Sequence, residues 1–174
     1  MRKVTLEELK QLALDSKDSL WEQANGVGRD VKLYLHWSAG HYGQFFEDYH
    51  INIDADGSLF ISTDDLSEIK FHTWRRNTGA IGIALACCAF ATTNDLGDEP
   101  PTDLQIEAMA NVVRVLCKTL DLTIDNQRVL THAEAADLDD YGYNTTCERW
   151  DLLFLHNGDA IGSGGDIIRA KANQ

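Results

Sequence analysis

The segment Val31 to Ser38 reads VKLYLHWS, and it decides the class of fold. Its β-branched, aromatic and aliphatic residues are typical of a β-strand. The segment Ala80 to Ala89 (AIGIALACCA) is a continuous apolar run, which favours a strand buried on both faces of a sheet. A further short strand is predicted at Arg128 to His132 (RVLTH). We therefore expect a sheet whose central strands are covered on both sides.

Helices are predicted between these strands. Thr5-Leu6-Glu7-Glu8 has the form of a capping box and begins a helix that runs to about Ala24. Thr102 with Gln105 caps a second helix, in which apolar residues from Ile106 to Leu120 follow the 3, 4 spacing of one helix face. Because strands and helices interleave, the predicted class is α/β, with a central mixed β-sheet flanked by helices.

The remaining segments are weaker signals. Tyr49–Ile53 and Ser58–Ser62 are predicted to form a hairpin around Asp56-Gly57, which is a turn signal. Trp150–Leu155 is predicted to be a short helix, and the glycine-rich tail after it has no clear prediction. The sequence shows no internal repeats, and 174 residues suit one domain with a single core.

Composition and charge exclude several classes of function. The net charge is −13, from 15 Lys and Arg against 28 Asp and Glu, which argues against nucleic acid as a partner. No apolar run reaches about 18 residues, so no membrane span is predicted. Met1 to Lys10 is charged and polar with no apolar segment after it, so we expect a chain made in the cytoplasm without a signal peptide. The cysteines form no CxxC pair and are interpreted as reduced core thiols.

Three residues could form a metal site. His36 lies at the end of the first predicted strand, His132 follows the last one, and Asp151 comes further along the chain. Two histidines and a carboxylate are a ligand set of catalytic zinc, which keeps a fourth position for water. Taken singly, each of the three is more often a structural histidine or a helix cap, and no HExxH helix is present. Spacing alone indicates only a possible metal site.

The order of motifs along the chain is more specific. The chain resembles the zinc-dependent N-acetylmuramoyl-L-alanine amidases, a family that includes phage endolysins and peptidoglycan recognition proteins. The resemblance runs from about 31 to 155 and leaves the helix at 5–24 and the tail at 156–174 as extensions. Five motifs carry it: Leu35–Ser38, Tyr49–Ile53 with its hairpin, His72–Asn77 before Ala80–Ile83, Pro101–Gln105, and Val129–His132.

The resemblance implies the metal ligands. His36 and His132 would be the histidine ligands of one zinc ion. The family's third ligand is an Asp or Cys two residues after a catalytic Lys, which Arg149-Trp150-Asp151 matches with Arg in place of Lys. Asp151 is therefore the predicted ligand and Cys147 the alternative. Arg149 could hold a positive charge beside a developing oxyanion, although an arginine does not readily give up a proton.

The resemblance also implies a residue beside the water nucleophile, which is a Tyr or a Glu in the family. The Glu position is Ala84 here, whereas Tyr49 matches the Tyr variant. A phenol hydroxyl can orient and polarise water without first losing its proton. We therefore predict that Tyr49 is catalytic.

Three residues are predicted to line the substrate groove: Trp37, His72 and Asn77. His50 also matches a family position and is interpreted as structural, or as a residue that orients a ligand imidazole.

The function implied by the resemblance is hydrolysis of the amide between N-acetylmuramic acid and L-alanine in peptidoglycan. Two alternatives stay open: an inactive peptidoglycan-binding module, and a zinc hydrolase with another amide substrate. The enzyme would act in the cell wall after release, or on muropeptides in the cytoplasm. The sequence predicts no oligomeric state.

Overall fold

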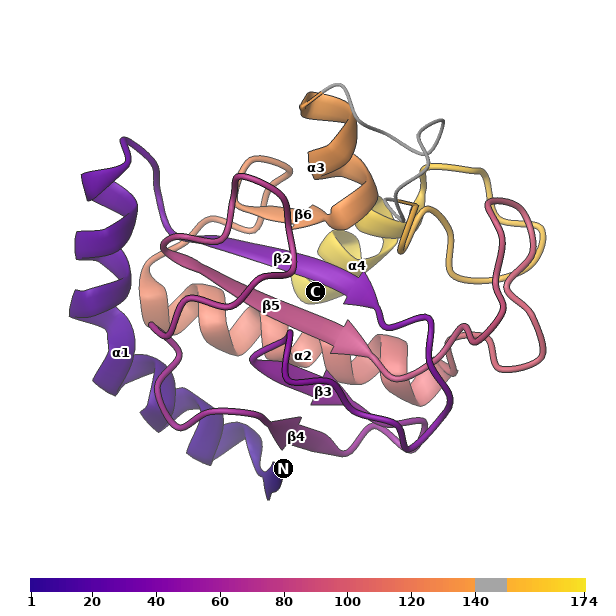
Figure 1. The fold of residues 1–174 in the computed structure, drawn as a ribbon, viewed down its shortest axis with the longest axis horizontal. Helices are drawn as coiled ribbons and strands as arrows, with labels where there is room; N and C mark the ends of the chain where they lie inside the picture. Colours follow the sequence, from indigo (N-terminus) through magenta and orange to yellow (C-terminus); the bar gives the residue numbers. More distant parts are fainter. Residues whose placement is uncertain (140–149) are drawn as a thin grey trace.

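One mixed sheet organises the molecule. The structure is a computed structural model, and it describes residues 1–139 and 150–174. The strand order is β1-β4-β3-β5-β2-β6 (Figure 1). Strands β3, β5, β2 and β6 run parallel, and the β3–β4 and β4–β1 pairs are antiparallel. The predicted mixed sheet is confirmed. The strands are β1 Arg2–Val4, β2 Lys32–Trp37, β3 Ile51–Ile53, β4 Leu59–Ile61, β5 Ala80–Leu85 and β6 Val129–Thr131.

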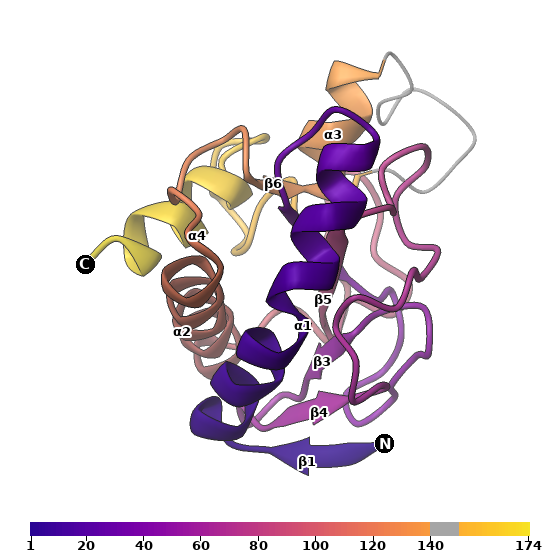
Figure 2. The same cartoon turned by 90° about the vertical axis from the view of Figure 1, so that its left-hand side faces the viewer.

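Most of the helical structure lies on one face of this sheet. The described helices are α1 Leu6–Gly26, α2 Asp103–Leu120, α3 His132–Leu138 and α4 Gly164–Ala172. Figure 2 shows α2 and α4 on one side of the sheet and the loops before and after β3 and β4 on the other. Helix α1 packs against α2, and α4 packs against α2 and β6. Within the described ranges, no helix is long and apolar enough to cross a membrane.

Both predicted capping boxes are present. The Thr5 hydroxyl accepts from the Glu8 N–H at the start of α1, and Thr102 accepts from the Gln105 N–H at the start of α2. Gln105 is also fully buried, and its Nε2 donates at 3.0 Å to the backbone oxygens of Ile53 and of Ala86. These bonds satisfy carbonyl groups at the ends of β3 and β5, so α2 is attached to the sheet where the parallel strands end.

The two faces of the sheet carry different side chains. Residues alternate between the faces of a strand. In β2, Leu33, Leu35 and Trp37 join the large core under the helices, whereas Tyr34 belongs to a separate small cluster. In β5, three large aliphatic residues face that core, and Ala80, Gly82 and Ala84 occupy the opposite face. The second face therefore has room for bulky rings from elsewhere.

The segment Trp150–Leu155 corrects one prediction, because it forms turns rather than a helix. Leu152 has φ +60°, a left-handed conformation that the interior of a right-handed helix does not allow. The aliphatic side chains of the segment 150–155 are nonetheless buried in the core. A buried turn has the same apolar composition as a short buried helix, so composition alone does not distinguish the two.

Other boundaries also differ from the predictions. Strand β5 ends at Leu85 instead of continuing to Ala89, and Cys88 beyond it has φ +68°. Strand β1, helix α3 and helix α4 were not predicted. Helix α4 begins with two glycines that come close to neighbouring chain segments: a Cβ on Gly164 would lie 2.0 Å from the Leu152 oxygen. The glycine-rich tail is thus part of the packed fold.

Candidate metal centre and cleft

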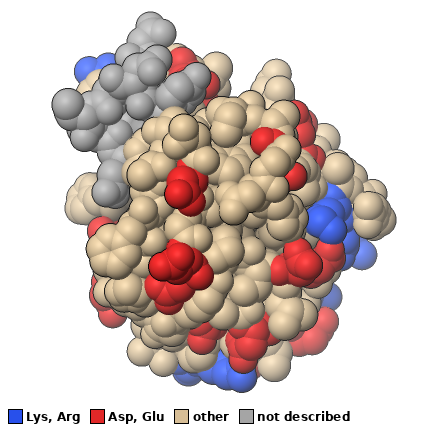
Figure 3. All heavy atoms as spheres, turned by 90° about the vertical axis from the view of Figure 1, so that its right-hand side faces the viewer, with Lys and Arg blue, Asp and Glu red and all other residues tan. Residues whose placement is uncertain are grey.

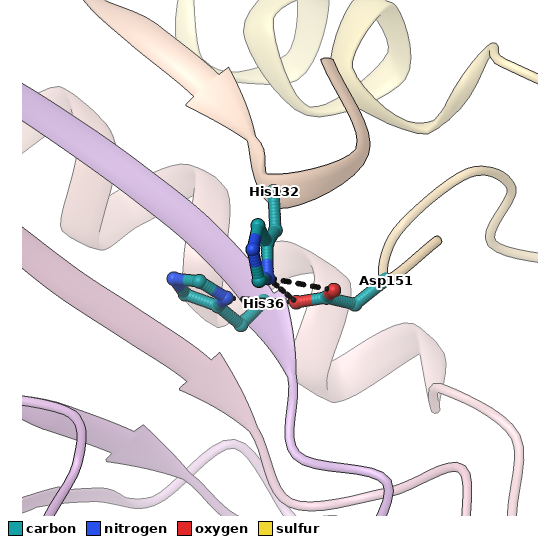
Figure 4. Close-up of side chains that lie close together, drawn as sticks. All are labelled: His36, His132 and Asp151. Atoms are coloured by element: carbon teal, nitrogen blue, oxygen red, sulfur yellow. Dashed lines mark hydrogen bonds and ion pairs between the residues drawn. The ribbon is translucent and has the colours of Figure 1, made fainter. Parts of the chain in front are cut away.

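Three side chains from distant parts of the sequence meet at one point (Figure 4). His36 comes from the end of β2, His132 is the first residue of α3, and Asp151 lies in the turns that follow residue 150. The Nδ1 atom of His36 lies 2.7 Å from Oδ2 of Asp151, and Nδ1 of His132 lies 2.9 Å from Oδ1. The nearest ligand atoms of the three residues all lie within 4.8 Å of one another.

Helix α3 fixes the position of His132. The Thr131 hydroxyl accepts from the Glu134 N–H at 3.1 Å, and the Glu134 carboxylate accepts from the Thr131 N–H at 2.9 Å. This capping box begins the helix at His132. Arg169 from α4, which is 6% exposed, also donates to Glu134 at 2.8 Å. The sequence Thr131-His132-Ala133-Glu134 had the signature of this helix start, but it was interpreted as the end of a strand.

The charges at this point suit a cation. Burial opposes ionisation of Asp151, but His132 and His36 outweigh it and lower the pKa of this carboxyl to about 2. Burial also lowers the pKa of His36, and Asp151 only partly offsets it. We therefore describe the group as an ionised carboxylate with a neutral His36. Carboxylate and neutral imidazole are the forms that bind metal.

The donor set fits zinc. Two imidazole nitrogens and one carboxylate oxygen are a catalytic zinc set. With metal–ligand bonds of about 2.0–2.1 Å, tetrahedral ligand atoms lie roughly 3.3 Å apart. The two N···O separations here are shorter, at 2.7 and 2.9 Å, and the three ligand atoms all lie within 4.8 Å of one another. His36, His132 and Asp151 could therefore hold a metal ion once their side chains shift to make room for it.

The far side of the His36 ring contacts another histidine. His36 Nε2 lies 3.2 Å from Nδ1 of His72, and the Thr73 hydroxyl lies 3.4 Å from the same His36 nitrogen. Burial, together with the neighbouring His36 and His50, lowers the pKa of His72 well below its usual value. His72 is therefore a neutral, buried ring behind a candidate ligand.

His50 is fixed by the backbone on both sides. Its Nδ1 accepts from the Gly82 N–H at 3.0 Å, and its Nε2 lies 2.7 Å from the Glu68 oxygen. Burial lowers its pKa to about 4. His50 does not contact the three grouped residues, and these bonds support the structural interpretation.

An open cleft of about 570 Å³ lies beside the grouped residues. The Tyr49 ring lines it, with its centroid 5.0 Å from that of His36. Ala84 pairs with His36 across β2 and β5, so a small side chain occupies the position where a Glu was considered. The lining includes six residues singled out from the sequence: Trp37, Tyr49, His72, Asn77, His132 and Asp151.

Two of these residues also have clear structural contacts. Asn77 Oδ1 accepts from the N–H groups of His72 and Thr73, at 3.1 and 2.9 Å, and so shapes the loop. Trp37 is only 2% exposed and packs beside Trp150, with ring centroids 5.6 Å apart. A contact of either residue with substrate stays a prediction.

Two residues at the cleft edge, Phe71 and Arg75, were not singled out from the sequence. Phe71 is 80% exposed there, and the Arg75 guanidinium lies 4.0 Å from the centroid of the Trp74 ring. Arg75 has φ +64°, a conformation uncommon outside glycine. Only the exposure of these side chains distinguishes them, and sequence patterns do not reveal it. Arg149 and the alternative ligand Cys147 lie outside the described residues.

This fold and site define a class: an α/β protein with a His–His–Asp group that could hold a metal at the edge of a mixed sheet. The sequence from residue 18 to residue 150 matches the family model described as N-acetylmuramoyl-L-alanine amidase. The match covers more than half of the chain, and the chain belongs to this family. The matched range includes His36 and His132 and ends one residue before Asp151.

A solved structure is similar as well. It is that of the endolysin N-acetylmuramoyl-L-alanine amidase LysCS from Clostridium intestinale URNW, with 17% sequence identity and a TM-score of 0.45. The similarity covers 61% of this chain and 70% of that chain. No curated protein matches the sequence.

Proposed function

We propose that this protein is a zinc-dependent hydrolase that cleaves the amide bond between N-acetylmuramic acid and L-alanine in peptidoglycan. The observation that carries the proposal is the convergence of His36, His132 and Asp151 beside an open cleft in a chain of the amidase family. The two histidines are the family's predicted ligands, and the fold brings a carboxylate to both of them.

The positions of the two histidine ligands are proposed to be fixed before the metal binds. His36 lies on β2, a strand that pairs with β5 on one side and with β6 on the other. His132 is positioned by the capped start of α3. Rigid elements on two sides preserve the geometry of the site. When bound, zinc supplies Lewis acidity that polarises a carbonyl group and activates water.

Tyr49 is proposed to orient the water nucleophile. Its ring lies on the cleft side of His36, and its side chain is partly exposed to the cleft. Ala84 provides no carboxylate beside His36, so among the residues considered for this role Tyr49 is the one that has a proton-bearing group. Arg149 is proposed to place its positive charge near the developing oxyanion.

The cleft is proposed to bind the sugar and the first part of the stem peptide. Exposed rings such as Phe71 and Trp74 offer apolar faces for stacking. The surface where β2 and β5 end has acidic side chains spread across it and basic ones near its edges (Figure 3). Binding of an anionic wall polymer is therefore proposed to depend on the cleft rather than on a broad basic face.

The test is product analysis by mass spectrometry of purified peptidoglycan incubated with the protein, with and without a zinc chelator. Free stem peptides that begin with L-alanine, released only with zinc, are expected. Asp151→Asn keeps the size of the side chain but weakens the ligand, so it is the matched inactive control. Cleavage that survives chelation would refute zinc dependence. Bound zinc without any cleavage would favour a binding module.

Two further comparisons refine the proposal. Metal content of Asp151→Asn against Cys147→Ala tests the third ligand, and only the first variant is expected to lose zinc. Rates on intact sacculi against soluble muropeptides test the setting: faster cleavage of sacculi would favour action in the wall after release, and the reverse would favour muropeptides in the cytoplasm.

A further inference from the structure

The His36 ring has two nitrogens with two different tasks. Its Nδ1 points toward Asp151, 2.7 Å away, and toward the His132 side chain. To bind a metal, this nitrogen must present a lone pair, so in a neutral ring the proton must be on Nε2. The side chain of His36 is 1% exposed. Its Nε2–H therefore needs an acceptor inside the protein, because a buried donor without one costs stability.

His72 provides the nearest acceptor. Its Nδ1 lies 3.2 Å from His36 Nε2, whereas the Thr73 hydroxyl lies 3.4 Å away. The same hydroxyl lies 3.0 Å from His72 Nδ1, so it lies beside both nitrogens of the His36–His72 contact. The two imidazole rings meet edge to face, at 81° and with centroids 5.2 Å apart. An N–H···N bond requires the donor N–H to meet the acceptor lone pair in the plane of the acceptor ring, and a near-perpendicular angle between the two ring planes is compatible with it.

The position of His72 is built into the sheet. Its ring rests on Gly82 of β5, where a Cβ would lie 2.7 Å from His72 Cδ2 and 2.9 Å from its Nε2. Asn77 Oδ1 accepts from the backbone N–H of His72 and so holds the loop in place. His50 packs against the ring from another side, with centroids 5.8 Å apart. A ring confined in this way has little freedom to turn toward a substrate.

We propose that His72 is a positioning residue whose Nδ1 accepts the hydrogen bond of His36 Nε2–H and thereby keeps His36 Nδ1 directed at the metal. The inference rests on the proposed metal site, and it replaces the predicted substrate contact of His72 with a role behind a ligand. It also explains the glycine at 82, since any larger residue there would displace the His72 ring.

The bond also sets the tautomer of His72. If its Nδ1 accepts, its proton is on Nε2, and this buried atom has no hydrogen-bond partner in the described part of the chain. An unsatisfied, buried Nε2–H is therefore the cost of keeping Nδ1 free as an acceptor. Hydrogen bonds to the second nitrogen of a ligand histidine orient the ring and raise its basicity, and their loss typically lowers metal affinity about 10–100-fold.

The experiment measures zinc affinity by competition with a chromophoric chelator. His72→Phe keeps a ring against Gly82 but removes the acceptor, and we expect zinc binding about 10–100-fold weaker. His72→Asn can place its amide oxygen near the position of Nδ1 and is expected to restore most of the affinity. His41→Phe is the matched control, because His41 is exposed and bonds to Glu99 away from the ligands. It should bind zinc like the wild type.

Unchanged zinc affinity in His72→Phe, with a raised KM, would overturn the inference and make His72 a substrate contact. If the wild type itself bound no zinc, the proposed metal site would fail and the inference with it, so the two failures are distinguishable. A measurement on the unmutated protein covers the case in which His72→Phe does not fold. In ¹⁵N spectra of the zinc-loaded wild type, we expect protons on Nε2 of both His36 and His72, and a proton on His72 Nδ1 would overturn the inference.

Discussion

The two faces of the sheet are formed by the same strands but carry different kinds of side chain. On the helix-covered face, Leu33 and Leu35 of β2 and Ile81 and Ile83 of β5 are all fully buried in the apolar core. On the other face, Tyr34 and His36 alternate with them, and β5 offers only alanine and glycine. One face fills space with aliphatic side chains, whereas the other leaves space that imidazole rings occupy.

The helix-covered face contributes mainly to stability, whereas the polar face carries the proposed chemistry. Burial of aliphatic surface is non-directional and roughly proportional to area, so the helix-covered face tolerates exchange between residues of similar volume. The polar face depends on directed hydrogen bonds, such as those between His36, His72 and Asp151. Loss of one partner there leaves a buried polar group unsatisfied. Neighbouring residues of β2 should therefore respond very differently to the same substitution.

The largest effect is expected for His36→Ala, on the polar face. Loss of a ligand should remove the metal and with it several kcal/mol of transition-state stabilisation, on the order of a 10³-fold loss in kcat/KM. Metal content and amidase activity are measured together. His132→Ala should behave in the same way. Full activity in either variant would contradict the metal assignment.

Leu35→Ala changes the residue next to His36 in β2, on the opposite face of the sheet, and is the matched partner of His36→Ala. It should lower the free energy of unfolding by about 2–5 kcal/mol, because it removes buried methyl groups and leaves a cavity. Denaturant titration measures the loss. The folded fraction should keep its zinc and its kcat/KM. A loss of zinc without a loss of stability would contradict the assignment of stability to one face and metal binding to the other.

Tyr49→Phe tests the cleft side of His36. The phenyl ring keeps the packing against His36, so zinc binding should not change. Loss of the hydroxyl should lower kcat on the order of 10²-fold, the contribution of an acid–base group. Stopped assays on soluble muropeptides measure the rate, and an unaltered kcat would remove Tyr49 from the mechanism.

Gly82→Ala adds one methyl group to the polar face. The new Cβ would lie 2.7 Å from the His72 ring, and overpacking of this kind costs about 1–3 kcal/mol. The melting temperature should fall and zinc binding should weaken as His72 moves. Ile83→Val is the control on the neighbouring, helix-covered position, where a smaller side chain should lower stability but leave zinc affinity as in the wild type.

The smallest effect is expected from His50 and depends on pH. Its folded pKa is about 4, below the unfolded value of about 6.5. The unfolded chain therefore takes up the proton first, so the stability that is fully present above about pH 6.5 is lost as pH falls toward 4. At about pH 5.5 the loss from this group should be about 1 kcal/mol. Urea titrations of metal-free wild type and His50→Gln should show a shallower pH dependence in the variant.

Much of the fold was predictable from local patterns. The capping boxes at Thr5 and Thr102 are local signals, and so is the 3, 4 spacing of apolar residues in the helix after Thr102. Helices α1 and α2 lie where these signals predicted them. The aromatic and aliphatic residues of β2 likewise predicted a strand, and the continuous apolar run of β5 predicted a buried one. Short elements were missed or misplaced because three-residue strands such as β1, and turns with buried leucines such as 150–155, carry too little pattern to identify.

The site was predictable only in part. Residue types and motif order singled out His36, His132 and Asp151, and the structure brings them together. The neighbours of those residues were harder to predict. His50 and His72 match family positions equally well, yet His50 is bound by backbone groups and His72 contacts His36. No local pattern distinguishes two histidines whose difference lies in what the folded chain places beside them.

The sequence by itself determined the class of fold, the family and the donor atoms offered to a metal, because periodicity, capping and residue chemistry are properties of short segments. The tertiary structure alone decided that Asp151 reaches both histidines, that His72 rests on Gly82 behind His36, and that one sheet face is left open to a cleft. These are contacts between residues far apart in the chain, and their distances depend on how the sheet and helices pack rather than on any one segment.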